Sequence, residues 1–162
     1  MMSGVKAMQK TNVLRILDSM GIDYRVATYP VGDEHLDAPS VARELGVSPD
    51  IVFKTLVAHD ETHAIHVFCI PGAAALDLKK AAKATGSRKV ELVNLKDLTP
   101  LTGYVRGGCS PIGMKKKYPT WMDEIASTFD AIYVNAGARG MQVILAPADA
   151  CRAADALFAD LV

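Results

Sequence analysis

Residues 51–58 read Ile51-Val52-Phe53-Lys54-Thr55-Leu56-Val57-Ala58, and a second β-rich run, Ala64-Ile65-His66-Val67-Phe68-Cys69-Ile70, follows them. The polar segment His59–His63 separates the two runs, which predicts a β-hairpin with a short connection. Pro71 and Gly72 end the second strand, because proline and glycine interrupt regular structure.

The elements around this hairpin alternate irregularly between helix and strand. Apolar periodicity and stop signals predict helices over Thr11–Met20, from Pro39 to Gly46, over Asp77–Thr85, and from Pro147 onward with Leu157 facing inward. Strands are predicted over Ile22–Tyr29, Val90–Val93, Ala131–Asn135 and Met141–Ala146, whereas Trp121–Phe129 fits either type. Without regular βαβ alternation, the order predicts the α+β class, with a mixed, partly barrel-like β-sheet and surrounding helices.

Length and composition are those of one globular domain. The chain has 162 residues and is 50% hydrophobic and 22% charged, which argues against disorder. We expect a flexible leader over residues 1–10 and a single domain over 11–162. No apolar run approaches the roughly 18 residues that span a bilayer, and no signal core is present, so a cytoplasmic protein without membrane contact is expected.

Charge is distributed unevenly along a chain whose formal net charge is zero. The segment 79–117 carries ten Lys/Arg and two Asp/Glu, whereas residues 1–78 carry six and ten, and residues 118–162 carry two and six. Such asymmetry is typical of a surface that binds a polyanion. A solvated basic helix face followed by a lysine-rich loop explains it equally well.

Lys54 is a charged residue within an apolar strand. Alternation places it on the face shared by Val52 and Leu56. Burying an unpaired ammonium is costly. One interpretation is a cation held in a pocket, where it binds a phosphate or polarises a carbonyl. The other is a lysine of an edge strand that reaches water.

Two glycine-containing loops could bind an anion. The first, Gly107-Gly108-Cys109-Ser110-Pro111-Ile112-Gly113, exposes backbone N–H groups that suit an oxyanion or a terminal ribose and phosphate. It matches neither a nucleophile elbow nor a P-loop, and no histidine near Cys109 in sequence would activate that thiol. The second, Asn135-Ala136-Gly137-Ala138-Arg139-Gly140, is either an ordinary hairpin turn or a further loop at the same rim, with Arg139 available for a phosphate or carboxylate.

The sequence predicts neither a metal site nor a cofactor site. His63 and His66 are three positions apart in one strand and therefore point to opposite faces, which argues against a shared metal with His59. Cys69, Cys109 and Cys151 are an odd number without a CxxC spacing, which favours reduced thiols.

Several motifs together resemble the YbaK/EbsC family of aminoacyl-tRNA deacylases, whose members are similar to the editing domain of some prolyl-tRNA synthetases. They occur in the family's order from about Thr11 to the C-terminus: Thr28-Tyr29, Phe53-Lys54-Thr55-Leu56, Leu76-Asp77-Leu78-Lys79-Lys80, Thr102-Gly103-Tyr104-Val105-Arg106-Gly107-Gly108, Ser110-Pro111-Ile112-Gly113, and Tyr133-Val134-Asn135 leading to Gly137 and Arg139-Gly140.

The resemblance implies a single aminoacyl-tRNA editing domain that removes a wrong amino acid, Cys in the first place, from tRNA(Pro). It implies catalytic roles for Lys54 and Tyr29. It also implies a substrate-binding group consisting of Thr55, Gly107, Gly108, Ser110, Pro111, Gly113, Asn135, Gly137 and Arg139. The partner would be the 3′ acceptor end of an aminoacyl-tRNA, and tRNA identity would come from prolyl-tRNA synthetase or from no partner.

Departures from the family leave the substrate open. Cys109 stands where a branched apolar residue is usual, and Asn135, Ala136 and Ala138 stand where many members have Ser, Gly and Lys. In the Cys-specific route the substrate thiol attacks its own ester and leaves as a cyclic thiolactone. The alternatives are a deacylase that removes Ala or another small residue with water, and a non-catalytic module that binds an amino acid or an RNA end.

Overall fold

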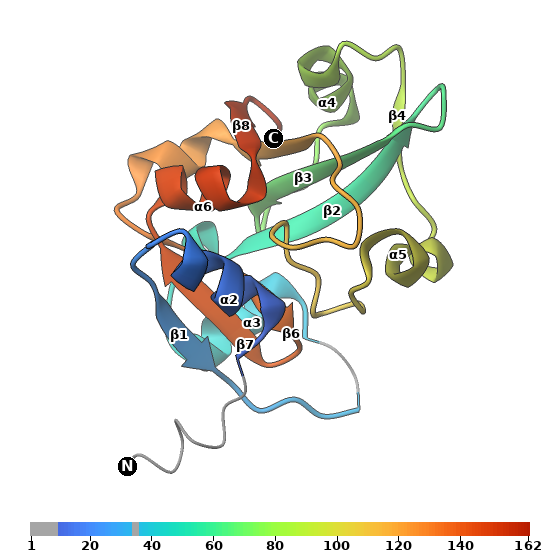
Figure 1. Cartoon of the computed structure of the whole chain (residues 1–162). Coiled ribbons are helices and arrows are strands. Elements are labelled where there is room, and N and C mark those ends of the chain that lie inside the picture. The colour runs from blue at the N-terminus through green and yellow to red at the C-terminus, as the bar shows by residue number, and fades with distance from the viewer. Residues whose placement is uncertain (1–9, 34–35) are drawn as a thin grey trace, which may run out of the picture.

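The computed structural model describes residues 10–33 and 36–162, and it contains two β-sheets with helices packed around them (Figure 1). The predicted leader, apart from Lys10, lies outside the described residues. No helix in the described ranges is long and apolar enough to cross a membrane.

The larger sheet is built on the predicted hairpin. Strands β2 (Phe53–Asp60) and β3 (Ile65–Pro71) are antiparallel, and the strand order is β4-β2-β3-β5-β8. The short strand β4 (Val90–Leu92) pairs with the far end of β2, whereas β5 (Thr120–Asp123) and β8 (Ala156–Ala159) are parallel additions on the β3 side. The strand starts at Phe53 rather than Ile51, because the Ser48 hydroxyl caps a 3₁₀ turn over Pro49–Ile51.

The smaller sheet has the order β1-β7-β6 and is antiparallel throughout. It consists of β1 (Arg25–Thr28), β7 (Met141–Leu145) and β6 (Ile132–Ala138), and the β6–β7 register shifts between Asn135 and Ala138. One parallel bridge, Val52 to Tyr133, links it to the start of β2. The predicted α+β class with a mixed sheet is confirmed. The two sheets do not close into a barrel, because that bridge is the one backbone pairing between them in the described chain.

Four helices are those predicted from the sequence: α2 (Asn12–Ser19), α3 (Ala38–Leu45), α4 (Leu78–Thr85) and α6 (Pro147–Ala154). The structure adds α5 (Leu95–Thr102), which the helices predicted above do not include. The side chains of Thr11, Asp37 and Asp77 accept hydrogen bonds from backbone N–H groups in the first turns of α2, α3 and α4. Gly46 and Gly86 end α3 and α4 in the left-handed conformation, which costs glycine little.

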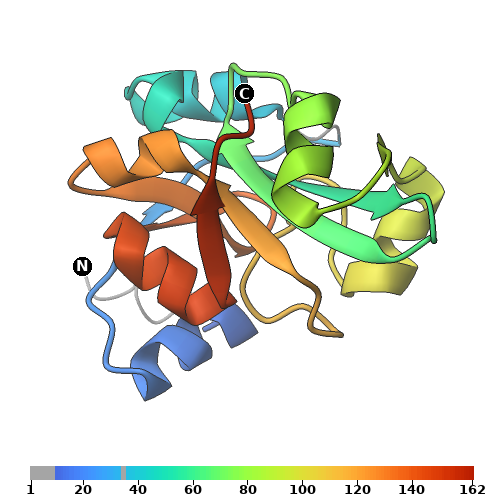
Figure 2. The same cartoon turned by 90° about the horizontal axis from the view of Figure 1, so that it is seen from above.

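Three buried clusters hold the elements together. Helices α2 and α6 lie side by side in Figures 1 and 2, and their apolar residues pack on the smaller sheet, including Val13, Leu17, Ala150 and Ala154. Helix α4 covers the larger sheet through Ala81, and α3 packs through Val41 and Ala42 against Val52.

The C-terminal segment differs from the prediction. Helix α6 ends at Ala154 because Asp155 takes a left-handed backbone with φ of 53°, which aspartate tolerates better than most residues. The chain then enters β8, so Leu157 is 64% exposed instead of facing inward. The ambiguous segment Trp121–Phe129 divides into the end of β5 and a 3₁₀ helix over Glu124–Thr128, which the Asp123 carboxylate caps.

Candidate functional site

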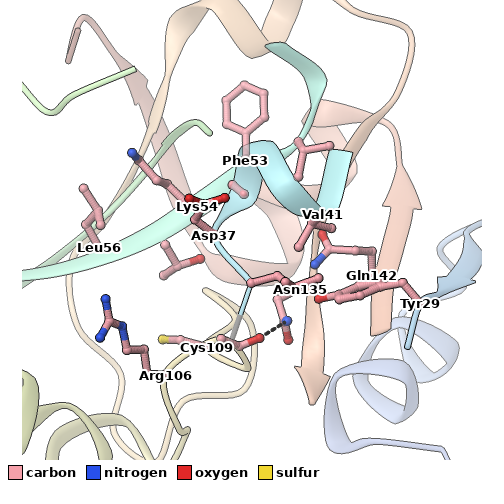
Figure 3. Close-up of a pocket in the computed structure, with 15 residues that line it drawn as sticks. Tyr29, Asp37, Val41, Phe53, Lys54, Leu56, Arg106, Cys109, Asn135 and Gln142 are labelled. Atoms are coloured by element: carbon pink, nitrogen blue, oxygen red, sulfur yellow. Dashed lines mark hydrogen bonds between the residues drawn. The ribbon is translucent and has the colours of Figure 1, made fainter. Parts of the chain in front are cut away.

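A pocket of about 260 Å³ lies where the two sheets meet (Figure 3). Its walls come from the end of β1, the start of α3, the first half of β2, the glycine-rich loop and strands β6 and β7. It brings together five of the site residues predicted from sequence: Tyr29, Lys54, Thr55, Gly107 and Asn135.

Lys54 lies part-buried on the β2 wall of this pocket. Burial lowers the pKa of its ammonium below the ordinary 10.5, and the nearby Asp37 carboxylate partly opposes that shift. Figure 3 shows Asp37 next to the Lys54 side chain. Asp37 is also the N-cap of α3, since its Oδ1 accepts a hydrogen bond from the Ser40 N–H at 2.9 Å. The helix start therefore fixes a negative charge near the pocket cation.

Asn135 connects the two loops that the sequence singles out. Its Nδ2 donates a 2.9 Å hydrogen bond to the Gly107 carbonyl oxygen, drawn as a dashed line in Figure 3. Its Oδ1 accepts hydrogen bonds from the N–H groups of Gly137 at 2.6 Å and Ala138 at 3.0 Å. The Asn135 amide thus stabilises the bulge of β6 and holds the glycine-rich loop against it.

Gly108, Gly137 and Arg139 support the site without lining it. A Cβ on Gly108 would come within 3.1 Å of the Arg139 backbone nitrogen, so glycine permits the close approach of the two loops. The Arg139 guanidinium donates a 3.0 Å hydrogen bond to the Gly32 carbonyl oxygen. This position suits a side chain that holds the segment after β1 better than one that binds a ligand in the pocket.

The second half of the glycine-rich loop also lies outside the pocket. Ser110 is fully buried, and its hydroxyl accepts a hydrogen bond from the Ile112 N–H at 3.1 Å. Tyr104 donates its hydroxyl to the Ile112 carbonyl, which fastens the loop from the other side. Pro111 and Gly113 line a separate hollow beside Lys116, Lys117 and Arg152. We conclude that these residues shape the loop.

Tyr29 lines one side of the pocket. It is 9% exposed and belongs to the cluster of Val41, Ala42 and Val52. Its backbone N–H donates to the Gly140 carbonyl at 3.0 Å, which ties the end of β1 to the second loop. In Figure 3 its ring extends toward Asn135, so the side chain forms part of the pocket wall on the side of Asn135 and Gln142.

Sequence reasoning missed three polar residues of the pocket, namely Asp37, Arg106 and Gln142. Gln142 is 4% exposed and pairs with Asn135 across β6 and β7, and its Oε1 is buried with no hydrogen-bond partner among the described residues. A polar side chain within the apolar strand Met141–Leu145 is the same signal that marks Lys54. Asp37 could have been found from its place just before the helix that Pro39 marks, where an aspartate commonly caps the first turn.

Comparison with known proteins decides the family. Residues 34–153 match the family described as "Aminoacyl-tRNA editing domain", and this range is more than half of the chain. The chain belongs to the aminoacyl-tRNA editing domain family. It is 49% identical over 146 residues to an inferred Cys-tRNA(Pro)/Cys-tRNA(Cys) deacylase, EbsC of Enterococcus faecalis, covering 90% of this chain and 89% of that protein.

Solved structures share the editing-domain fold. A crystal structure of an inferred trans-editing enzyme for prolyl-tRNA synthetase has a TM-score of 0.79 at 23% identity, covering 94% of this chain and 98% of the other. The crystal structure of a hypothetical protein gives 0.83 at 23% identity, covering 93% and 99%. These likenesses support the fold alone.

Cys109 lines the pocket of this editing domain as a neutral thiol. Burial raises its pKa to about 12, so the thiolate that a nucleophile requires is scarce at neutral pH. Among the described residues, no histidine is placed to activate this thiol: His59 and His63 stack on each other at the hairpin tip with ring centroids 5.6 Å apart. His66 is buried, with its Nε2 3.0 Å from the Asp60 carboxylate. The described residues contain no group of three or more His, Cys, Asp or Glu side chains placed to hold a metal ion.

Proposed function

We propose that this editing domain acts as a free-standing deacylase that removes a mischarged amino acid, Cys in the first place, from tRNA(Pro). Family membership and the similarity to EbsC support this proposal. The observation that carries it is the part-buried Lys54 ammonium on the pocket wall, opposite the loop that Asn135 fixes.

The aminoacyl ester is already activated, so the pocket mainly has to position it and polarise its carbonyl. In the proposed complex the Lys54 ammonium would hold the 3′-terminal nucleotide close to the ester. Backbone groups of Gly107 and its neighbours would fix the aminoacyl group. Tyr29 would bound the pocket beside the amino-acid side chain, which favours small residues.

The neutral Cys109 thiol favours a nucleophile from outside the protein. For a Cys substrate, the thiolate sulfur would attack the carbonyl carbon of the same residue. A C–S bond forms, the ester C–O bond breaks, and the thiol proton ends on the ribose oxygen of the released tRNA. The cyclic thiolactone then reacts with water to give free cysteine. A free Cys thiol, with a pKa near 8.5, supplies a few per cent thiolate at neutral pH.

The proposed partner is the acceptor end of the tRNA. The basic segment 79–117 would contact its phosphates, which predicts salt-sensitive affinity with little sequence preference. Recognition of tRNA(Pro) would then come from prolyl-tRNA synthetase or be absent.

The test is deacylation of Cys-tRNA(Pro) and Ala-tRNA(Pro) by the wild type, Lys54→Ala and Arg15→Ala. Arg15 is exposed on α2 outside the basic segment, which makes it a matched control for loss of a positive charge. We expect rapid loss of Cys with the wild type and Arg15→Ala, and a rate lower by about 10²-fold with Lys54→Ala. The S-methylated Cys ester should not be cleaved, because its sulfur cannot form a thiolate.

Other results would revise the proposal in specific ways. Cleavage of the Ala ester, or of the S-methylated ester, would make water the nucleophile and keep the enzyme class. If neither ester is cleaved above background, even with prolyl-tRNA synthetase added, the deacylase proposal fails and a binding module takes its place.

A further inference from the structure

A second hollow continues from the pocket along the outer part of β2. It has a volume of about 190 Å³ and lies between β2, β4 and α5, which Figure 1 shows next to one another. Its walls are mainly apolar side chains: Leu56, Val57, Leu92, Val93, Leu95 and Leu98. We call this hollow the β4–α5 groove.

The groove and the pocket share one boundary. Both are lined by Thr55, Leu56, Arg106, Gly107 and Cys109. Figure 3 places Leu56 and Arg106 at the side of the pocket away from Tyr29 and Gln142. A ligand that fills the pocket can therefore extend into the groove past Arg106.

The rim of the groove exposes more apolar surface than a solvated loop region requires. Leu92 is 50% exposed and Leu95 is 55% exposed. Val105, next to Arg106, is 51% exposed. Clustered apolar side chains of this kind beside a binding site mark a surface that a ligand covers. Arg106 is exposed and is the one charged side chain among the groove's lining residues.

The chemistry of the substrate limits what can occupy this place. In an aminoacyl-tRNA, the terminal ribose carries both the ester and the terminal base. When the aminoacyl group lies in the pocket, that base must lie within one nucleotide of it. An apolar groove suits the face of a base, and one arginine at the boundary suits the phosphate that precedes it.

We propose that the β4–α5 groove binds the terminal nucleobase of the acceptor strand, with Arg106 contacting the adjacent phosphate. This inference rests on the proposed deacylase function. It assigns the base to Leu92 and Leu95, whereas the aminoacyl group belongs to the pocket of Lys54 and Asn135.

The experiment uses a short single-stranded RNA with the tRNA 3′-end sequence, uncharged, with 2-aminopurine as its terminal base. Fluorescence is titrated with the wild type, Leu92→Ser, Leu95→Ser and Leu157→Ser. Leu157 is a matched control, because it is 64% exposed on β8 and lines neither hollow. Melting curves establish that each variant is folded, which the exposure of the three leucines favours.

We expect a saturable fluorescence change with the wild type and Leu157→Ser, and an affinity lower by roughly 5-fold or more with either groove variant. Arg106→Ala should reduce the slope of log affinity against log salt by about 0.7, which corresponds to one phosphate contact on a single strand. Equal affinities for Leu95→Ser and Leu157→Ser would overturn the proposal. The proposal would also be overturned if the groove variants bind the RNA as tightly as the wild type and lose only a stimulation of their activity by prolyl-tRNA synthetase.

Failure of this inference is distinguishable from failure of the proposed function, because the RNA carries no ester. If the wild type is an active deacylase and the groove variants bind the RNA as the wild type does, only the proposal for the groove is refuted. Groove-dependent RNA binding without any deacylation by the wild type would refute the deacylase and leave an RNA-end-binding module.

Discussion

The side-chain amide of Asn135 donates a 2.9 Å hydrogen bond to the carbonyl oxygen of Gly107, a residue 28 positions earlier in the chain. The same amide accepts hydrogen bonds from the N–H groups of Gly137 and Ala138. One buried side chain therefore sets the positions of two loops, one that lines the pocket and one that supports it. In this arrangement Asn135 is a positioning residue whose own polar atoms are engaged within the protein.

Replacing Asn135 should therefore affect stability and activity together. Asn135→Ala leaves the Gly107 carbonyl and two backbone N–H groups without their partner, and we expect a loss of about 1–3 kcal/mol in the free energy of unfolding. Asn135→Asp keeps the two acceptor bonds, replaces the donor to Gly107 by an oxygen that faces the Gly107 carbonyl, and adds a negative charge at a buried position. Urea unfolding and deacylation measured on both variants separate these effects. If Asn135→Asp is as active as the wild type, the bond to Gly107 does not position the loop.

The close approach of the loops gives a second prediction, at Gly108. An alanine methyl there would lie 3.1 Å from the Arg139 nitrogen and 3.3 Å from the Ala138 carbonyl carbon, and backbone atoms cannot move aside cheaply. We expect Gly108→Ala to cost about 1–3 kcal/mol of unfolding free energy and to reduce activity. Gly32→Ala is the control, because a Cβ at Gly32 meets no atom within 4 Å. Equal melting temperatures for the two variants would show that the loops are not tightly packed.

Sequence patterns predicted the elements that local rules determine. The hairpin of β2 and β3 and the helix over Asp77–Thr85 rest on local signals, and both are present in the structure. Strand β8 was missed because its parallel pairing with β5 joins residues far apart in sequence, and no local signal overrode the helical pattern after Pro147. For the same reason, the predicted helix reaches Leu157, beyond the observed end of α6 at Ala154.

The site was predictable where a residue conflicts with its surroundings. Lys54 stands out because burying a charge in an apolar strand is costly, and the structure places Lys54 on the pocket wall. By contrast, Ser110 and Pro111 belong to the same short motif as Gly107, yet the turn of the loop places them behind the site. Which residues of a motif face the ligand depends on backbone direction, which spacing does not specify.

Asp60 at the hairpin tip predicts a pH-dependent contribution to stability. Hydrogen bonds from the Thr62 side chain and His66, with backbone bonds from Thr62 and Ala64, hold the pKa of this carboxyl well below its ordinary 3.8. A lowered carboxyl pKa stabilises the fold at pH above the unfolded value, and that stability is lost as pH falls below it. The melting temperature should drop less between pH 6 and pH 3 in Asp60→Asn than in the wild type. An equal drop would mean that other carboxylates dominate acid unfolding.

Gln142 permits a test that separates stability from function. Its buried Oε1 has no hydrogen-bond partner in the described part of the chain, so Gln142→Met, which keeps the shape and removes the polar group, should leave the unfolding free energy unchanged or raise it by up to about 1 kcal/mol. If the carboxamide contacts substrate in the pocket, the same change should lower kcat/KM by about tenfold. A clear loss of stability would instead show that Gln142 holds β7 in place.

Lys54 determines how activity should depend on pH. Because burial lowers the pKa of its ammonium from 10.5, with Asp37 opposing, a reaction that needs the charged form should lose rate at a lower pH than an exposed lysine would allow. Lys54→Arg keeps the positive charge across that range, since a guanidinium does not deprotonate, so its residual activity should lack the alkaline fall. The S–H ionisation of a Cys substrate raises the rate of both enzymes with pH. The quantity to measure is therefore the ratio of the Lys54→Arg rate to the wild-type rate, by single-turnover deacylation from pH 7 to 10. We expect this ratio to rise with pH. A ratio that stays constant would show that protonation of Lys54 does not limit the reaction.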